Sequence, residues 1–357
     1  MARTKQTARK TLQIPNLLDT VKAKVYKRRT PKPKKEIARS GKPRGEPRDG
    51  CEVLIGYPGS WDHTIYETID HKNAAHLFRH QSSFNKMKMW SLEGECARVR
   101  EYVENSGLYN VVVNYVITYD KVAVSSFCER YYGEVDTFQL PFCEMAVTPD
   151  DAEQILGMQV EGKSTNDKFN KSLGWDEIYV LTRNLFGWDK ETTDGLFVPG
   201  TKYPNKEFKL VEIREMYVDT LTKEKVDGLS DMECRYTAAG YLLYVLASVV
   251  FPDIKGNRVS ANLLQLLDSL EDVNKFYWGM AIVAVLNGQF SQASRERTSQ
   301  INENLTLLQV WIFDHFPSLF KDNEDVKLNP KWSNCSPTGT LYLFTGSQKK
   351  EQTNAFI

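Results

Sequence analysis

Cysteines and long apolar segments are scarce in this 357-residue sequence. No two of its six cysteines show the Cys-X-X-Cys spacing, which argues against a zinc ribbon or a redox motif. Their scattered positions do not suggest a disulfide framework either, so we expect reduced and mostly buried thiols. The longest apolar run, from Tyr241 to Phe251, is too short to span a bilayer, and the N-terminus lacks the apolar core of a signal peptide. We therefore expect no contact with a membrane and no secretion.

An excess of either charge is also missing from the chain as a whole, since 46 Lys and Arg residues balance 46 Asp and Glu residues. This balance hides a division, because residues 1–50 hold 16 basic and 4 acidic residues, whereas residues 51–357 hold 30 and 42. The first segment is rich in proline and glycine and has no apolar periodicity, which predicts a disordered basic arm before an acidic folded body. Any contact with nucleic acid is expected to be weak and to fall on this arm.

A compact basic cluster lies inside the arm, in the sequence KRRTPKPKK. Its prolines, Pro31 and Pro33, keep the chain extended and the basic side chains accessible. Short segments of this kind are typical of nuclear localisation signals, and a solvated linker is the alternative. The residues expected to carry the signal are Lys27, Arg28, Arg29, Lys32, Lys34 and Lys35.

The chain opens with the sequence MARTKQTARK. After removal of Met1, residues 2–10 resemble the extreme N-terminus of the core histone H-three, and the resemblance then stops. A free α-amine followed by cations and hydroxyls in extended chain is what readers and modifiers of histone tails recognise. The candidate residues for such mimicry are Ala2, Arg3, Thr4, Lys5, Lys10 and Thr11. The alternative is an appended peptide or a chimeric gene assignment.

Helix signals dominate the body from about residue 70 onward. Thr148-Pro149 with two following aspartates predicts a helix start, Gly157 predicts its end, and Ser230 with Glu233 forms a capping box. Further helices are predicted over 120–131, 176–186, 208–221, 260–270, 274–294 and 303–316. Strand signals are restricted to a hairpin over 137–140 and 144–148 and to residues 341–345. The sequence therefore predicts a mainly α fold: a single large helical domain over 51–335 with a minor β-hairpin, preceded by the arm at 1–50 and followed by a tail at 336–357.

No catalytic constellation emerges from the motifs of the sequence. Residues 157–164 (GMQVEGKS) fit the letters of a P-loop, but an amphipathic helix precedes them and no apolar helix pattern follows, so we do not expect a nucleotide site. The group His71, His76 and His80 lacks a recognisable zinc pattern, and we expect neither a metal site nor a cofactor. Arg295 and Arg297, in the segment SRERTSQ, are expected to pair locally, and binding of an anionic partner is the alternative.

The body resembles the plant mobile domain, a family also called aminotransferase-like or maintenance-of-meristems-like. The resemblance covers roughly residues 108–335 in three ordered blocks, and Cys143 stands where the family usually has glycine. The blocks are TFQLPFCEMAVTPDD at 137–151 with ILG and VEG after it, YLLY, FPD, GNRV and WGMA between 241 and 281, and ASR, SQI, LTLLQVW and FP between 293 and 317. Family members usually continue well beyond the Trp311 helix, so we expect either a shortened domain or one whose final part has been replaced.

The resemblance implies a transposon-derived domain of nuclear proteins. We therefore predict a nuclear, non-enzymatic interaction module in chromatin silencing, genome integrity or meristem maintenance. The resemblance also implies that its partners are nuclear proteins, including phosphatase-like ones, and the arm adds readers or modifiers of histone tails. Two alternatives remain open: a metal-dependent nuclease or transposase accessory derived from a mobile element, which needs converging carboxylates, and an inert transposon remnant.

Overall fold

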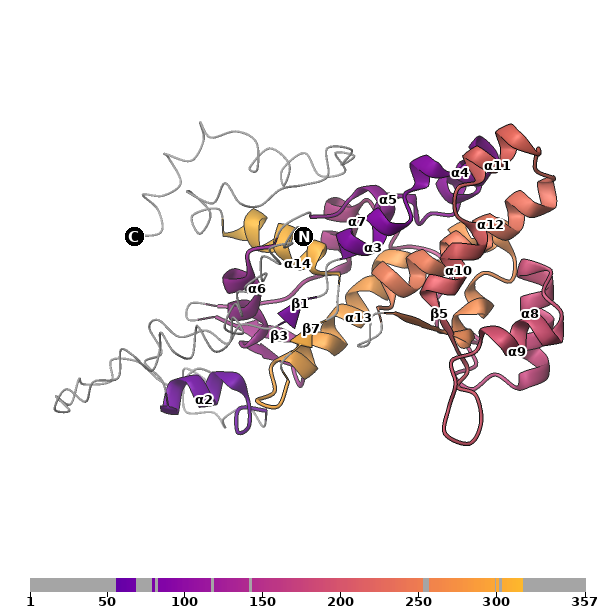
Figure 1. Cartoon of the computed structure of the whole chain (residues 1–357). Coiled ribbons are helices and arrows are strands. Elements are labelled where there is room, and N and C mark those ends of the chain that lie inside the picture. The colour runs from indigo at the N-terminus through magenta and orange to yellow at the C-terminus, as the bar shows by residue number, and fades with distance from the viewer. Residues whose placement is uncertain are drawn as a thin grey trace, which may run out of the picture. The chain divides into compact units, whose positions relative to one another are not determined.

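The computed structural model describes residues 56–68, 79–80, 83–116, 119–140, 143–252, 257–298, 300–301 and 304–316 (Figure 1). The predicted basic arm, its nuclear localisation cluster and its histone-like start lie outside these residues, as do His71, His76, the predicted strand at 341–345 and the C-terminal tail. Contacts divide the chain into two compact units. Of the described residues, the smaller unit contains those within 56–79, 121–145 and 291–298, and the larger unit contains those within 80–120, 146–290 and 300–316.

The smaller unit contains the three-stranded sheet of the protein. Its elements are α2 (Trp61–Thr68), α6 (Lys121–Cys128), β2 (Tyr131–Tyr132), β3 (Thr137–Gln139) and β4 (Glu144–Met145). The strands are antiparallel in the order β2-β3-β4, and Phe138 on β3 lies opposite both Tyr131 and Met145. Phe138 is fully buried and meets the rings of Phe127 and Tyr131 edge to face. The predicted hairpin is therefore confirmed, and the structure adds the short strand β2 in front of it.

The larger unit is built mostly from helices. Its elements up to residue 250 are α3 (Ser83–Met89), η1 (Leu92–Gly94), α4 (Ala97–Asn105), α5 (Tyr109–Val113), α7 (Pro149–Leu156), α8 (Trp175–Phe186), α9 (Lys190–Leu196), β5 (Glu207–Lys209), α10 (Leu210–Tyr217), α11 (Thr220–Val226), α12 (Asp231–Val245) and η2 (Leu246–Val250). After these come β6 (Arg258–Ser260), η3 (Ala261–Leu266), η4 (Leu270–Lys275), α13 (Trp278–Ala293, from Ser291 on in the smaller unit), β7 (Gln300–Ile301) and α14 (Leu305–His315). Strand β1 (Arg79–His80) has one residue in each unit. The mainly α prediction is confirmed.

Helix α12 is the central element of the larger unit. It packs against α4, α8 and α10, as Figure 1 shows for α4 and α10. Every residue from Thr237 to Val245 is buried, because neighbours cover the helix on all sides. The apolar sequence continues into η2, a π-helical turn over Leu246–Val250 that is also fully buried. None of the described helices is long and apolar enough to cross a bilayer.

Capping residues in the sequence correctly predicted the start or the end of two helices. Thr148 forms a capping box at the start of α7, and Gly157 ends that helix with a φ of 68°. Ser230 forms a second capping box at the start of α12. The helix predicted over 208–221 is instead divided into β5, α10 and α11, because the backbone turns at Asp219, whose φ is 66°. The helices predicted over 260–270 and 274–294 become the 3₁₀ segment η3 and the later-starting α13.

Candidate functional site

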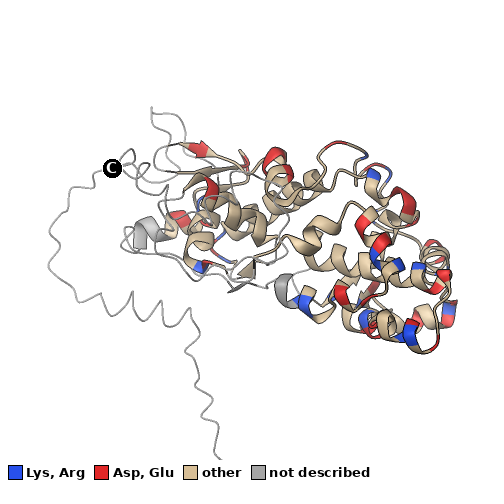
Figure 2. Cartoon of the chain, turned by 90° about the horizontal axis from the view of Figure 1, so that it is seen from above, with Lys and Arg blue, Asp and Glu red and all other residues tan. Residues whose placement is uncertain are grey.

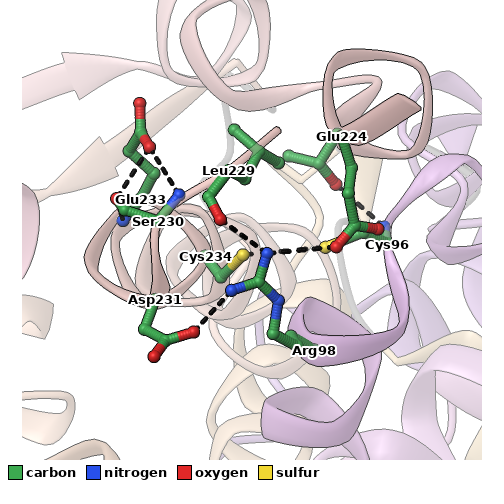
Figure 3. A network of polar contacts seen from close by, with 9 residues as sticks. Cys96, Arg98, Glu224, Leu229, Ser230, Asp231, Glu233 and Cys234 are labelled. Atoms are coloured by element: carbon green, nitrogen blue, oxygen red, sulfur yellow. Dashed lines mark hydrogen bonds and ion pairs between the residues drawn. The ribbon is translucent and has the colours of Figure 1, made fainter. Parts of the chain in front are cut away.

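A polar network joins the N-terminal ends of α4 and α12 (Figure 3). Arg98, in the first turn of α4, donates to Asp231 Oδ1 at 2.5 Å, to the Leu229 carbonyl at 2.6 Å and to Glu224 Oε1 at 3.1 Å. These acceptors come from α12, from the loop before it and from α11. The hydrogen bonds to Asp231 and Glu224 raise the pKa of Arg98, so its guanidinium remains cationic. One side chain thus ties three helices together.

Two thiols lie beneath this network. Cys96 occupies the N-cap position of α4, Cys234 lies in the first turn of α12, and their Sγ atoms are 3.8 Å apart. Both are fully buried and form a small apolar cluster with Val99 and Ala238. Burial raises the pKa of Cys234 to about 12, and its neighbour Cys96 acts in the same direction. A thiol that stays protonated is a poor nucleophile and a poor metal ligand, so Cys234 serves packing.

A buried carboxylate anchors the start of α11. Glu95 is fully buried, and its Oε1 accepts from the Trp90 indole at 2.7 Å and from the Asp219 amide at 3.2 Å. Its Oε2 accepts from the Thr220 amide at 3.3 Å and from the Thr220 hydroxyl. Four donors fill the acceptor capacity of this carboxylate, which compensates for the cost of burying its charge. Glu95 therefore acts as a structural anchor and has no free lone pair to offer as a general base.

A cavity of about 250 Å³ lies beside this anchor, between η1, α4, α5 and α12. Arg100 and Glu104 of α4 line it together with Tyr241 of α12, while Leu92 and Val112 contribute apolar wall. Tyr241 is fully buried, and its hydroxyl has no hydrogen-bond partner among the described residues. Burial strongly raises the pKa of Tyr241, so its phenol stays neutral and is a hydrogen-bond donor.

The segment that fits the letters of a P-loop has a different geometry. Helix α7, not a strand, precedes it, and the next helix, α8, begins only at Trp175. The Lys163 amide donates to the Lys275 carbonyl at 2.7 Å, and the Lys163 carbonyl accepts from Tyr277 at 3.1 Å. The Lys163 ammonium lies 5.0 Å from the centre of the Phe276 ring. The backbone of this segment is hydrogen-bonded to residues 275–277, so its amides do not converge on a phosphate position.

Arg295 has a local structural role within the smaller unit. Its Nη1 donates to the Gly56 carbonyl at 2.7 Å, while the Gly56 amide donates to the Glu134 carboxylate at 2.8 and 3.0 Å. The neighbouring Ser294 carbonyl accepts from the Trp61 amide at 2.8 Å. Arg297 is exposed. For Arg295 the geometry favours local pairing over the alternative of an anion-binding residue.

The pairing of Arg98 with Asp231 was not found from the sequence. Arg98 and Asp231 are 133 positions apart, and no local pattern indicates their pairing. Within the described ranges, no group of three His, Cys, Asp or Glu residues is placed to hold a metal ion. Basic and acidic residues are interspersed along the helices in Figure 2, so this view presents no face of a single charge.

Comparison with known proteins gives the family. The sequence profile described as "Plant mobile domain" matches residues 107–355. The chain belongs to the plant mobile domain family. The match begins directly after α4, so the junction joins a segment outside the family profile to α12 inside it.

Curated relatives come from Arabidopsis thaliana. Protein MAINTENANCE OF MERISTEMS is 27% identical over 258 residues, which are 70% of this chain and 50% of the relative. Protein MAIN-LIKE 1 is 27% identical over 237 residues, 65% of this chain and 42% of the relative. A serine/threonine-protein phosphatase 7 long form homolog is 26% identical over 244 residues, 66% of this chain but 16% of the relative. The chain thus spans half or less of the length of these relatives, and no solved structure matches.

Proposed function

We propose that this chain is a nuclear, non-enzymatic interaction module of transposon-derived type, acting in chromatin silencing, genome integrity or meristem maintenance. The observation that carries the proposal is the family match over residues 107–355, with a relative named for the maintenance of meristems. The α4–α12 junction supports it, because Glu95 and Arg98 are each committed to several partners within the fold. Side chains held in this way rigidify a scaffold and are not available for chemistry.

The proposed partners are nuclear proteins. A phosphatase homolog shares the family segment over 16% of its length, so a mobile domain and further sequence coexist in that polypeptide. We include phosphatase-like proteins among the partners of this chain on that ground. The histone-like start adds readers or modifiers of histone tails, which would recognise Ala2, Arg3, Thr4, Lys5, Lys10 and Thr11.

The nuclear part of the proposal is tested by imaging the full chain with a C-terminal fluorescent tag. We expect nuclear signal, and we expect it to leave the nucleus when the six basic residues of the cluster at 27–35 are all replaced by alanine. The matched control replaces six other basic residues of the arm, namely Lys22, Lys24, Arg39, Lys42, Arg44 and Arg48. It removes the same charge and should remain nuclear. Equal distribution of both variants would contradict the assignment of the cluster.

The tail-mimic part is tested by mass spectrometry of the N-terminal peptide of the native protein recovered from nuclei. A mature start at Ala2 with methyl or acetyl groups on Lys5 or Lys10 is the expected result. A different start, or an unmodified peptide, would remove the histone-like segment from the proposal and leave the mobile domain untouched.

The non-enzymatic part is tested with the purified full chain, Mg²⁺ or Mn²⁺ and DNA. We expect no cleavage above that of the buffer. Cleavage that a chelator abolishes would favour the mobile-element nuclease instead. Plants that lack the gene and show unchanged meristems and unchanged transposon silencing would favour the inert remnant.

A further inference from the structure

The cavity beside the α4–α12 junction has the size of a metabolite site. Its volume of about 250 Å³ corresponds to roughly eight water molecules at about 30 Å³ each. This is below the range of about 300–1,000 Å³ for pockets that hold drug-sized ligands, so a compact molecule fits it best. The exposed side chain of Glu104 lies at its edge, and the fully buried Tyr241 lies behind its wall.

Two charged side chains of the cavity, Arg100 and Glu104, have no ion-pair or hydrogen-bond partner within the described part of the chain. Arg100 and Glu104 are four residues apart on α4, yet they form no ion pair with each other or with another described residue. Arg98, two residues earlier on the same helix, binds three acceptors. Unlike Arg98, therefore, Arg100 and Glu104 are not engaged in contacts that hold the described fold together.

The charges of the lining restrict the ligand. Arg100 favours an anionic group on the ligand, and Glu104 favours a cationic one. A phosphate or another multiply charged anion is disfavoured, because the lining carries two carboxylates against one guanidinium. The apolar part of the lining favours a hydrocarbon group on the ligand, because polar ligand atoms placed there would lose their hydration without compensation. This part consists of Leu92, Val112 and Val113.

We infer that this cavity binds a small zwitterion with an apolar body, in the chemical class of the free apolar amino acids. Its carboxylate pairs with Arg100, its ammonium pairs with Glu104, and its hydrocarbon part contacts Leu92 and Val112. Tyr241 lies behind the apolar wall, with its hydroxyl closed to solvent. The inference does not rest on the proposed function, and it adds a small-molecule input to an interaction module.

The test is isothermal titration calorimetry of the full chain with L-leucine, L-methionine and L-phenylalanine. Each amino acid is compared with its N-acetyl derivative, which lacks the ammonium, and with its amide, which lacks the carboxylate. We expect at least one of the three to bind and both of its derivatives to bind about tenfold more weakly or worse, because each loses one charge-assisted contact. A peptide end carries only one of the two charges, so this comparison also separates a free amino acid from a chain terminus. If none of the three amino acids gives a heat of binding at concentrations up to about 10 mM, the inference is overturned. This limit lies beyond the ~1 mM affinity of weak specific sites.

Substitutions assign each contact. Arg100→Gln should abolish the preference for the amino acid over its amide, and Glu104→Gln should abolish the preference over the N-acetyl derivative. Tyr241→Phe should leave binding unchanged, because the removed hydroxyl is closed to solvent and has no hydrogen-bond partner among the described residues. Glu101→Gln, an exposed change on the same helix outside the cavity, is the control and should bind like the original chain. Binding that Arg100→Gln and Glu104→Gln leave unchanged would place the ligand elsewhere and overturn the inference.

Discussion

The Sγ atoms of Cys96 and Cys234 lie 3.8 Å apart, although the two residues are 138 positions apart in the sequence. Cys96 precedes the region that matches the family profile, and Cys234 lies inside that region. Their contact therefore places the segment that carries α4 in the same core as α12. A fragment that starts at residue 107 would expose the buried face of α12 that Cys96, Val99 and Val103 now cover.

The buried thiols should resist alkylation. Burial raises the pKa of Cys234 to about 12, so its thiolate fraction at pH 8 is on the order of 10⁻⁴. We expect iodoacetamide to modify the half-buried Cys143 of the native protein much faster than Cys96, Cys128 or Cys234. Mass spectrometry of tryptic peptides measures the rates. In guanidinium chloride the difference should vanish, and equal rates in the native protein would show that the pair is accessible.

Removal of the Glu95 carboxylate should destabilise the larger unit strongly. Glu95→Ala leaves the Trp90 indole and both donors of Thr220 buried without an acceptor, at about 1–3 kcal/mol for each such group. We expect a loss of about 3 kcal/mol or more in the free energy of unfolding, measured in urea. Glu95→Gln retains one acceptor oxygen and should lose less.

The exposed residue Glu101 provides the control for this experiment. Glu101→Ala should change the free energy of unfolding by less than about 0.5 kcal/mol, as surface substitutions usually do. If Glu95→Ala were equally mild, water would have to replace the lost acceptor, and the carboxylate would not be an anchor.

The parts of the fold that were predictable from sequence are those with local causes. The capping boxes at Thr148 and Ser230 and the left-handed Gly157 were identified because each depends on residues within one helical turn. The hairpin was identified from alternation within twelve residues. Arg98, Glu95 and Tyr241 were not identified, because their roles depend on partners more than a hundred positions away. Their sequence surroundings look like those of ordinary helical residues.

The break between α10 and α11 illustrates a local feature that the sequence conceals. Asp219 has a φ of 66°, in the left-handed region that costs an L-residue with a Cβ roughly 1–2 kcal/mol. Its amide donates to Glu95, which holds the backbone in this conformation. An aspartate in the sequence YVDTLTKE gives no sign of this constraint, and so a continuous helix was predicted there.

The effect of substituting Asp219 on the free energy of unfolding should therefore depend on whether the replacement has a Cβ atom. Asp219→Gly should leave the free energy of unfolding unchanged or raise it, whereas Asp219→Ala should lower it by about 1 kcal/mol. Both variants keep the amide that donates to Glu95. Asp227 ends α11 with a φ of −112°, so there glycine should be the less stable of the two replacements. The same order of stability at both positions would mean that the left-handed backbone at Asp219 does not exist in solution.

The pair of Arg235 and Glu271 should make stability depend on pH in the acid range. The hydrogen bonds that Glu271 accepts from Arg235 lower the pKa of Glu271 from 4.5 to about 2. A carboxylate with a lowered pKa in the folded state stabilises the protein above its unfolded pKa, and this contribution is lost as the pH falls from about 4.5 toward about 2. Arg235→Gln should accordingly reduce the free energy of unfolding at pH 7 by no more than about 1 kcal/mol, because the Glu271 side chain is 60% exposed. The difference in the free energy of unfolding between Arg235→Gln and the original chain should shrink as the pH is lowered through that range.

Lys88→Gln is the control, because it removes an exposed cation without an ion-pair partner among the described residues. Its difference in the free energy of unfolding from the original chain should not change with pH. A gap for Arg235→Gln that is equally constant would mean that Glu271 titrates normally and that the pair forms no stabilising contact.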